Sequence, residues 1–168
     1  PFTLASYLIE GGPSREFLET KAFIHRHPDA WGGLMGLLTE SVAAFLRAQV
    51  DAGAQAVQVF DSWAGALSPQ DYTSKVLPYS RKLFDEILET GVPRIHFGTG
   101  TAGFLDRFRD AGGDVIGVDW RIPLDAAWRI VGEDRAIQGN LDPAALLAPE
   151  DVWRSAALDD KSPRRLQY

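Results

Sequence analysis

The chain has 168 residues, enough for one domain, and its 23 acidic and 17 basic side chains give a formal net charge of −6. This balance argues against binding to nucleic acid or to an anionic membrane surface, because both attract a basic face. The chain has no cysteine, which excludes a disulfide scaffold and a thiolate metal site and fits a reducing, cytoplasmic location.

An amphipathic helix is predicted before residue 53. Its apolar positions recur every four residues, at Leu38, Val42, Leu46 and Val50. Phe45 lies beside this apolar face, and Gly53 is placed to end the helix.

Four short apolar or β-branched runs follow, at residues 55–61, 94–97, 114–119 and 136–139. Each run has the length of a strand and ends at a turn-forming residue. Helical patterns separate the runs. The predicted inner face of the first helix is Leu83, Phe84, Ile87 and Leu88. That of the second is Phe104, Leu105 and Phe108, and that of the third is Leu124, Ala127, Trp128 and Val131. A last helix is predicted from Asp142 and Pro143, which suit a cap and a first turn.

Strands that alternate with helices through short connections predict a parallel sheet with right-handed crossovers. A doubly wound sheet and a (β/α)8 barrel both fit. In either architecture functional residues gather where strands end, which selects the turns at residues 61–63, 98–100, 119–120 and 139–142. We expect one incomplete α/β domain at residues 1–156 and a polar, frayed tail at residues 157–168.

The turn after the second predicted strand contains a glycine motif, GTGTAG, with Gly98, Gly100 and Gly103 at the spacing of a dinucleotide fingerprint. Asp119 follows at about the distance expected for an acid that binds a ribose. An NAD-binding oxidoreductase domain is therefore one hypothesis. Two polar residues in the preceding strand, and a strand–helix unit before it, argue against this hypothesis, because the fingerprint usually follows an apolar first strand.

Six segments of the sequence are similar, in the same order, to blocks of one known family: PFTLASYLIEGG, QVFDSWAGALSP, VLPYSRKLFDEI, HFGTGTAGFL, VIGVDWRIPLDAA and IQGNLDPAALLAP. Together they resemble the uroporphyrinogen decarboxylase family over about residues 1–150. A single block is weakly specific, whereas six in register are specific.

The resemblance implies a partial (β/α)8 TIM-type barrel with a deep cleft at the carboxyl ends of its strands. It also implies removal of four acetate carboxyl groups from uroporphyrinogen, which gives coproporphyrinogen in heme biosynthesis. Family members use no cofactor and are generally homodimers, so the implied partners are an anionic tetrapyrrole and, in the complete protein, a second copy. A protonated pyrrole can accept the electrons that the departing CO2 leaves, so the substrate takes the role of a cofactor.

Two residues match substrate-contacting positions of the family. Tyr7 stands at the position of its tyrosine and Ser62 at that of its serine, and both can hydrogen-bond a carboxylate. Further cleft-lining residues predicted from the strand ends are Phe60, Gly98, Gly100 and Asp119. Packing by Tyr7, turn capping by Ser62 and loop fixation by Asp119 remain alternative interpretations.

Three family blocks have no match in this sequence: the N-terminal arginine-rich motif, the catalytic aspartate after it, and a C-terminal glycine-histidine-glycine block. We therefore expect no catalytic residue in this chain, with the aspartate lying upstream. The chain begins at Pro1 and its single methionine is Met35, which indicates a fragment. Such a piece would expose unpaired strand edges, so we expect it to fold poorly and to be inactive alone.

The histidines do not predict a metal site. His25 and His27 would point to different faces of a helix, with no third ligand nearby. A zinc methyltransferase of the same barrel superfamily is disfavoured because the chain has no cysteine. His96 alternates with Ile95 in a predicted strand and could face the barrel interior, as a core or cleft residue.

Overall fold

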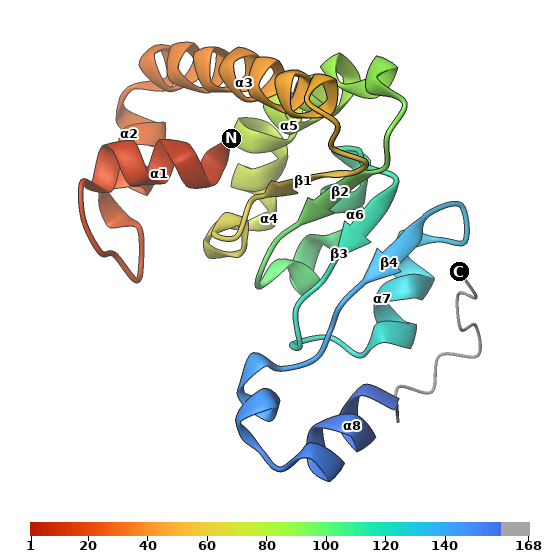
Figure 1. Cartoon of the computed structure of the whole chain (residues 1–168). Coiled ribbons are helices and arrows are strands. Elements are labelled where there is room, and N and C mark those ends of the chain that lie inside the picture. Colours follow the sequence, from red (N-terminus) through yellow and green to blue (C-terminus); the bar gives the residue numbers. More distant parts are fainter. Residues whose placement is uncertain (159–168) are drawn as a thin grey trace.

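A computed structural model describes residues 1–158 of the chain, and at their centre lies one sheet of four parallel strands (Figure 1). The strands are β1 (Val57–Phe60), β2 (Arg94–Phe97), β3 (Val115–Gly117) and β4 (Ala136–Gln138). The four predicted strands are thus confirmed, three of them shorter than the apolar runs in the sequence. Each strand pairs in parallel with the next one along the chain.

The helices between the strands cover one face of this sheet (Figure 1). They are α5 (Leu77–Glu86), α6 (Leu105–Asp110) and α7 (Leu124–Val131). The strand order β1-β2-β3-β4 never reverses. A doubly wound sheet reverses its order and places helices on both faces, whereas a barrel winds in one direction. The chain therefore has the winding of a partial barrel.

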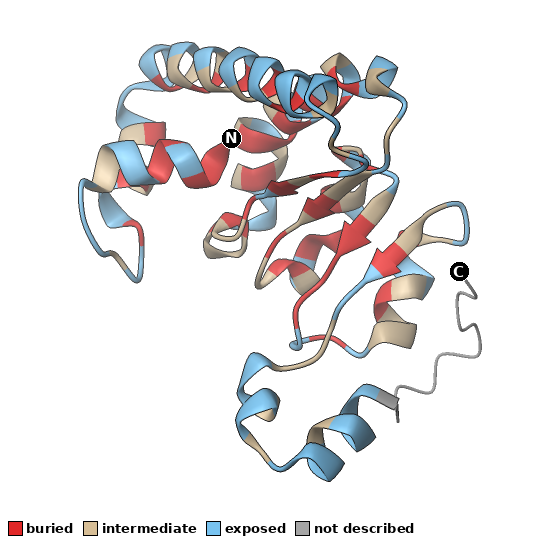
Figure 2. Cartoon of the chain, viewed as in Figure 1, coloured by how far each residue is buried: buried red, intermediate tan, exposed pale blue. Residues whose placement is uncertain are grey.

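The helix-covered face of the sheet is buried. The strand register places Val59, His96, Ile116 and Ile137 side by side on this face, and all four are buried (Figure 2). The hydrophobic core continues from them into the inner sides of α5, α6 and α7. Leu88, which was predicted to lie on the inner side of its helix, instead follows α5 in a 3-10 turn and is 58% exposed.

The opposite face of the sheet is bare in the part of the chain that the structure describes. Phe60 and Phe97 are neighbours on this face, and their rings meet edge to face with centroids 5.8 Å apart. The Phe60 side chain is 60% exposed. Since parallel sheets are normally covered on both faces, the exposed Phe60 beside the half-buried Phe97 marks the face that turns inward in a complete barrel.

Three helices precede the sheet: α1 (Phe2–Glu10), α2 (Leu18–Arg26) and α3 (Pro28–Asp51). The sequence pattern did not predict α1 or α2, and it predicted only the second half of α3. The buried side of α3 consists of Trp31, Met35, Thr39, Ala43 and Leu46. Leu46 of the predicted apolar face lies on this buried side, whereas Leu38, Val42 and Val50 are only partly buried, and Phe45 is 63% exposed.

Short elements complete the described chain: α4 (Pro69–Asp71), a π-helical turn (Tyr72–Val76), 3-10 turns at Ala64–Ala66, Leu88–Thr90, Thr101–Phe104 and Pro143–Leu147, and α8 (Glu150–Leu158). The helix predicted from Asp142 is therefore a 3-10 turn, which the Asp142 carboxylate caps by accepting the Ala144 N–H at 2.9 Å. Of the predicted tail, Ala157 and Leu158 belong to α8, and residues 159–168 lie outside the described residues. No helix within residues 1–158 is long and apolar enough to cross a membrane.

A buried carboxylate attaches α1 to the end of β1. Asp61 is fully buried, and its Oδ1 accepts the Thr3 N–H at 2.9 Å and the Thr3 hydroxyl at 3.2 Å. The Thr3 hydroxyl oxygen in turn accepts the Trp63 N–H at 3.2 Å. This junction fixes where α1 lies relative to the strand ends.

His96 lies on the helix-covered face and not in the barrel interior, so the expectation that it could face the interior was wrong. Its ring stacks on Phe108 with centroids 3.7 Å apart and contacts Phe84 at 4.8 Å. Burial lowers the pKa of the imidazole to about 3, and nearby backbone groups of Phe108 and Gly112 offset only part of this effect. His96 is therefore a neutral core residue.

We predict that His96 makes the protein sensitive to mild acid. In the unfolded chain the histidine has a pKa near 6.5, whereas in the folded protein it stays neutral down to about pH 3. Between these two values only the unfolded state binds the proton, so the free energy of unfolding falls as the pH drops from 6.5 toward 3. By pH 5 the loss should be roughly 2 kcal/mol. Chemical denaturation at pH 7.5 and pH 5 should show a smaller loss in His96→Leu than in wild type.

The matched control for this prediction is His25→Gln, because the His25 side chain is 60% exposed. It should keep the wild-type difference between the two pH values. An equal difference in His96→Leu and wild type would contradict the assigned role of His96, whatever the absolute stability of the variant.

We predict that Asp61→Ala destabilises the junction between α1 and β1. The change leaves two buried donors on Thr3 without their acceptor, at a cost of about 1–3 kcal/mol in the free energy of unfolding. Hydrogen exchange should also become faster at the amides of Thr3 and Trp63. Asp51→Ala, at an exposed position, should change neither the free energy of unfolding nor the exchange rates. Equal effects of the two variants would show that Asp61 does not hold α1 to the end of β1.

Candidate functional site

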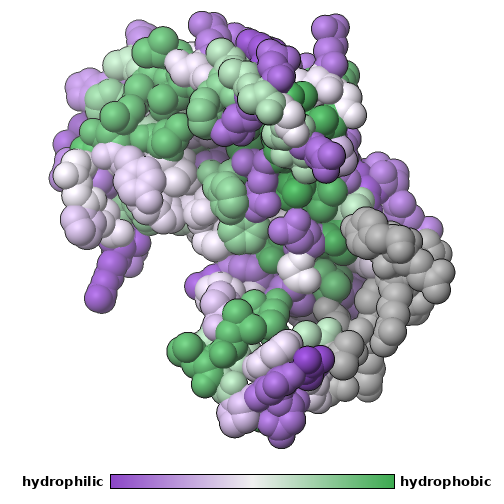
Figure 3. All heavy atoms as spheres, in the orientation of Figure 1, coloured by the Kyte–Doolittle hydropathy of each residue, from purple (hydrophilic) through white to green (hydrophobic). Residues whose placement is uncertain are grey.

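The carboxyl ends of the four strands point toward a hollow in the molecular surface between α1 and residues 139–158 (Figures 1 and 3). The turns selected from the sequence lie along this rim. The first two are in direct contact, because the Ser62 carbonyl accepts the Thr99 N–H at 3.4 Å and also the Thr99 hydroxyl. Gly65 completes the contact, since a Cβ there would lie 2.2 Å from the Thr99 carbonyl oxygen.

Asp119 joins the second turn to the third. The residue is only 5% exposed, and its Oδ2 accepts the Gly100 N–H at 2.7 Å. Its Oδ1 accepts the Arg121 N–H at 3.1 Å, and the carboxylate also pairs with the Arg121 guanidinium. Both oxygens of Asp119 are thus engaged within the protein, which favours the interpretation that it fixes the loop.

Tyr7 reaches the rim from α1. Its ring lies on Trp63 with centroids 4.2 Å apart, and Phe17 contacts the same indole at 4.7 Å. The Tyr7 side chain is 57% exposed, whereas Ser62, directly before Trp63, is half-buried. The structure therefore brings Tyr7 close to Ser62 at the end of β1, and their contact with substrate stays a prediction.

The remaining predicted site residues differ in their surroundings. Phe60 ends β1 on the bare face of the sheet. Gly98 instead faces the core, since a Cβ there would lie 2.8 Å from the Phe108 ring and from the Thr101 side chain. Gly100 has a φ of +68°, a left-handed conformation that favours glycine.

The glycine motif does not build a dinucleotide site. The Gly100 N–H is occupied by Asp119, the acid that would otherwise bind the ribose. The chain continues from this turn as a 3-10 turn (Thr101–Phe104), so no α-helix begins directly at the glycines to face a pyrophosphate. Packing against Phe108 and the close approach of Gly65 account for Gly98 and Gly100 without a nucleotide. With the single winding of the sheet, these contacts contradict the oxidoreductase hypothesis.

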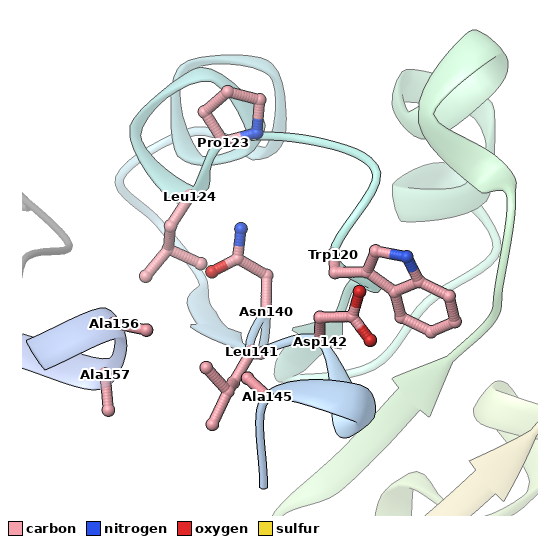
Figure 4. Close-up of a pocket in the computed structure, with 10 residues that line it drawn as sticks. Trp120, Pro123, Leu124, Asn140, Leu141, Asp142, Ala145, Ala156 and Ala157 are labelled. Atoms are coloured by element: carbon pink, nitrogen blue, oxygen red, sulfur yellow. The ribbon is translucent and has the colours of Figure 1, made fainter. Parts of the chain in front are cut away.

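A cavity of about 520 Å³ lies at the ends of β3 and β4 (Figure 4). Its lining comes from the turns after β3 and β4, the start of α7, the 3-10 turn at Pro143–Leu147 and α8: Trp120, Pro123, Leu124, Gly139, Asn140, Leu141, Asp142, Ala145, Ala156 and Ala157. Asn140 donates to the Ile122 carbonyl at 2.5 Å, which joins the last two turns of the rim. Among the described residues no cluster of three or more histidine and acidic side chains could hold a metal ion.

The selected turn at residues 61–63 contains Trp63, for which the sequence predicted no role. Its ring is the surface that the Tyr7 ring contacts. A further rim residue, Arg121, was not predicted. Arg121 pairs with Asp119 and places its guanidinium 4.3 Å from the centre of the Trp120 ring. Its position two residues after a strand-end acid could have identified it.

Comparison with known proteins agrees with this geometry. A family model described as uroporphyrinogen decarboxylase (URO-D) matches residues 1–159. A uroporphyrinogen decarboxylase of Carboxydothermus hydrogenoformans is 56% identical over 154 residues, which cover 92% of this chain and 44% of that protein. Those of Nocardia farcinica and Streptomyces coelicolor are 60% and 59% identical, over 88% and 90% of this chain and 42% and 43% of their own lengths.

The chain thus spans less than half the length of these relatives. The family match nevertheless includes every described strand and every turn of the rim. The chain belongs to the uroporphyrinogen decarboxylase family.

Proposed function

We propose that residues 1–158 form part of the substrate cleft of a uroporphyrinogen decarboxylase, which converts uroporphyrinogen III to coproporphyrinogen III. One observation carries the proposal: the exposed Phe60 ends β1, Ser62 follows it in the turn, and the Tyr7 ring contacts Trp63 of the same turn, beside the bare face of the sheet. The substrate is a large macrocycle edged by acetates and propionates. It needs an apolar surface bordered by donors, and this region offers both.

The hydroxyl groups of Tyr7 and Ser62 are the donors in this proposal. Both residues reach the rim at a point that the Asp61–Thr3 junction fixes, so little conformational freedom is lost when a carboxylate binds. Phe60 and Phe97 supply an aromatic surface on which the macrocycle packs.

We propose that the two buried acids of the rim position its turns and do not supply the reacting proton. Asp61 holds Thr3 through Oδ1, and Asp119 holds Gly100 and Arg121. We therefore propose that the catalytic aspartate lies in a part of the protein upstream of this chain, as the family resemblance implies. The reaction breaks the bond between an acetate methylene and its carboxylate. The electron pair passes into a protonated pyrrole ring, and the methylene then takes a proton to become a methyl group, so no cofactor is required.

We further propose that the complete protein is a cytoplasmic homodimer. The absence of cysteine supports a reducing compartment, and the homodimer follows from the family resemblance. Sedimentation of the protein expressed from its whole gene tests the oligomeric state.

We predict that Tyr7→Phe and Ser62→Ala each raise KM for uroporphyrinogen by about tenfold in the protein expressed from its whole gene, because each removes one hydrogen bond to a charged group. Chromatography of the oxidised porphyrin products measures the rates. Ser41→Ala, an exposed position on α3, is the matched control and should behave as wild type. Unchanged KM and kcat in both rim variants would show that their hydroxyls do not contact substrate.

We predict that the 168-residue chain by itself does not form coproporphyrinogen. Within the described residues β1 and β4 each have one strand neighbour, and the aromatic face between them is bare, so the substrate would meet only one wall of a cleft. Incubation with uroporphyrinogen, followed by product chromatography, checks this. Turnover comparable to that of the protein from the whole gene would overturn the prediction.

A further inference from the structure

We propose that Arg121 binds a carboxylate of the tetrapyrrole substrate and so acts as a further substrate-binding residue. This inference rests on the proposed function and names a contact that neither the sequence motifs nor the family resemblance assigned. The rim turns at residues 61–63, 98–100, 119–120 and 139–142 contain three acidic residues and no basic residue, and Arg121 follows the third turn directly. An anionic substrate that enters this rim needs a positive charge to offset the loss of hydration.

The guanidinium of Arg121 is exposed and held in a fixed orientation. Its side chain is 51% exposed, and one terminal nitrogen pairs with the Oδ2 of Asp119. The ring of Trp120 lies 4.3 Å from the guanidinium carbon and forms a second support. Neither Nε nor the second terminal nitrogen donates to another of residues 1–158. A planar guanidinium presented in this way can bind a carboxylate with two donors.

The position of Arg121 is coupled to the predicted substrate-contacting residues. Asp119 bonds to Gly100, the neighbouring Thr99 bonds to the Ser62 carbonyl, and Trp63 supports the ring of Tyr7. A chain of hydrogen bonds and close contacts therefore runs along the strand ends from α1 to the third turn. Because this chain fixes the spacing between the donors, one large ligand with several carboxylates can contact all of them.

A purely structural role does not explain why the Arg121 guanidinium is exposed and keeps donors that bind nothing within the described residues. The Arg121 backbone N–H and the Gly100 N–H already satisfy Asp119, so the loop keeps two hydrogen bonds without the guanidinium. The pair is one-sided, because the Asp119 side chain is buried whereas the Arg121 side chain is 51% exposed, and only one terminal nitrogen of the guanidinium contacts Asp119. A half-exposed arginine with unused donors at a substrate rim is better explained by an external anion.

The test compares Arg121→Gln and Arg121→Lys with wild type in the protein expressed from its whole gene. We expect Arg121→Gln to raise KM for uroporphyrinogen about tenfold or more with kcat changed less than threefold, and Arg121→Lys to restore part of the loss. The apparent affinity of Arg121→Gln should also depend less steeply on salt. Arg129→Gln removes an arginine that is 74% exposed on α7, and this control should leave KM, kcat and salt dependence unchanged.

Binding of two stable porphyrins, followed by fluorescence, identifies the carboxylate. Uroporphyrin I carries acetates and propionates, whereas coproporphyrin I keeps only the propionates. Weaker binding of both to Arg121→Gln supports a propionate contact, and weaker binding of uroporphyrin I alone supports an acetate contact. Wild-type affinity for both, or a loss of thermal stability with an unchanged KM, overturns the inference. Failure of the wild-type protein to convert uroporphyrinogen would instead sink the proposed function, so the two failures are distinguishable.

Discussion

The single winding of the parallel sheet is the constraint on which the rest of this structure depends. Because the strand order β1-β2-β3-β4 never reverses, every crossover helix lies on the same face. The residues that alternate onto that face, such as Val59 and His96, are buried with the helices. Those that alternate the other way, such as Phe60, meet no helix and stay exposed. The same winding brings all strand-end turns to one rim, so the sheet at once creates an aromatic surface and a border of polar groups.

The turns of the rim are held together by polar groups that bind one another. Asp61 holds α1, the Ser62 carbonyl holds the second turn, and Asp119 holds the second and third turns together. Each of these contacts uses a buried or half-buried polar atom that would be costly to leave without a partner. The buried acids of the rim therefore position its turns, while the exposed side chains of Tyr7 and Arg121 remain available for a ligand.

The sequence predicted the sheet well because its strands are short apolar runs that end at glycine or aspartate, a local signal. It predicted the turns of the rim for the same reason. The helices before the sheet were harder, since the buried side of α1 includes the small or polar residues Thr3, Ala5 and Ser6, and its position depends on distant contacts such as Thr3 with Asp61. The glycine motif misled because glycine records only that the backbone must turn or pack closely. What it packs against, here Phe108 and Gly65, depends on the fold. Arg121 was missed because its fixed orientation depends on Asp119 and Trp120 in three dimensions.

The central claim is that the strand-end rim and the bare face beside it hold a tetrapyrrole. A crystal structure of the protein from the whole gene with coproporphyrinogen bound tests this claim most directly. We expect the macrocycle to pack over Phe60, with its carboxylates beside Tyr7, Ser62 and Arg121. A ligand bound on the side of the sheet that α5, α6 and α7 cover, or one far from the ends of β1 and β3, would contradict it.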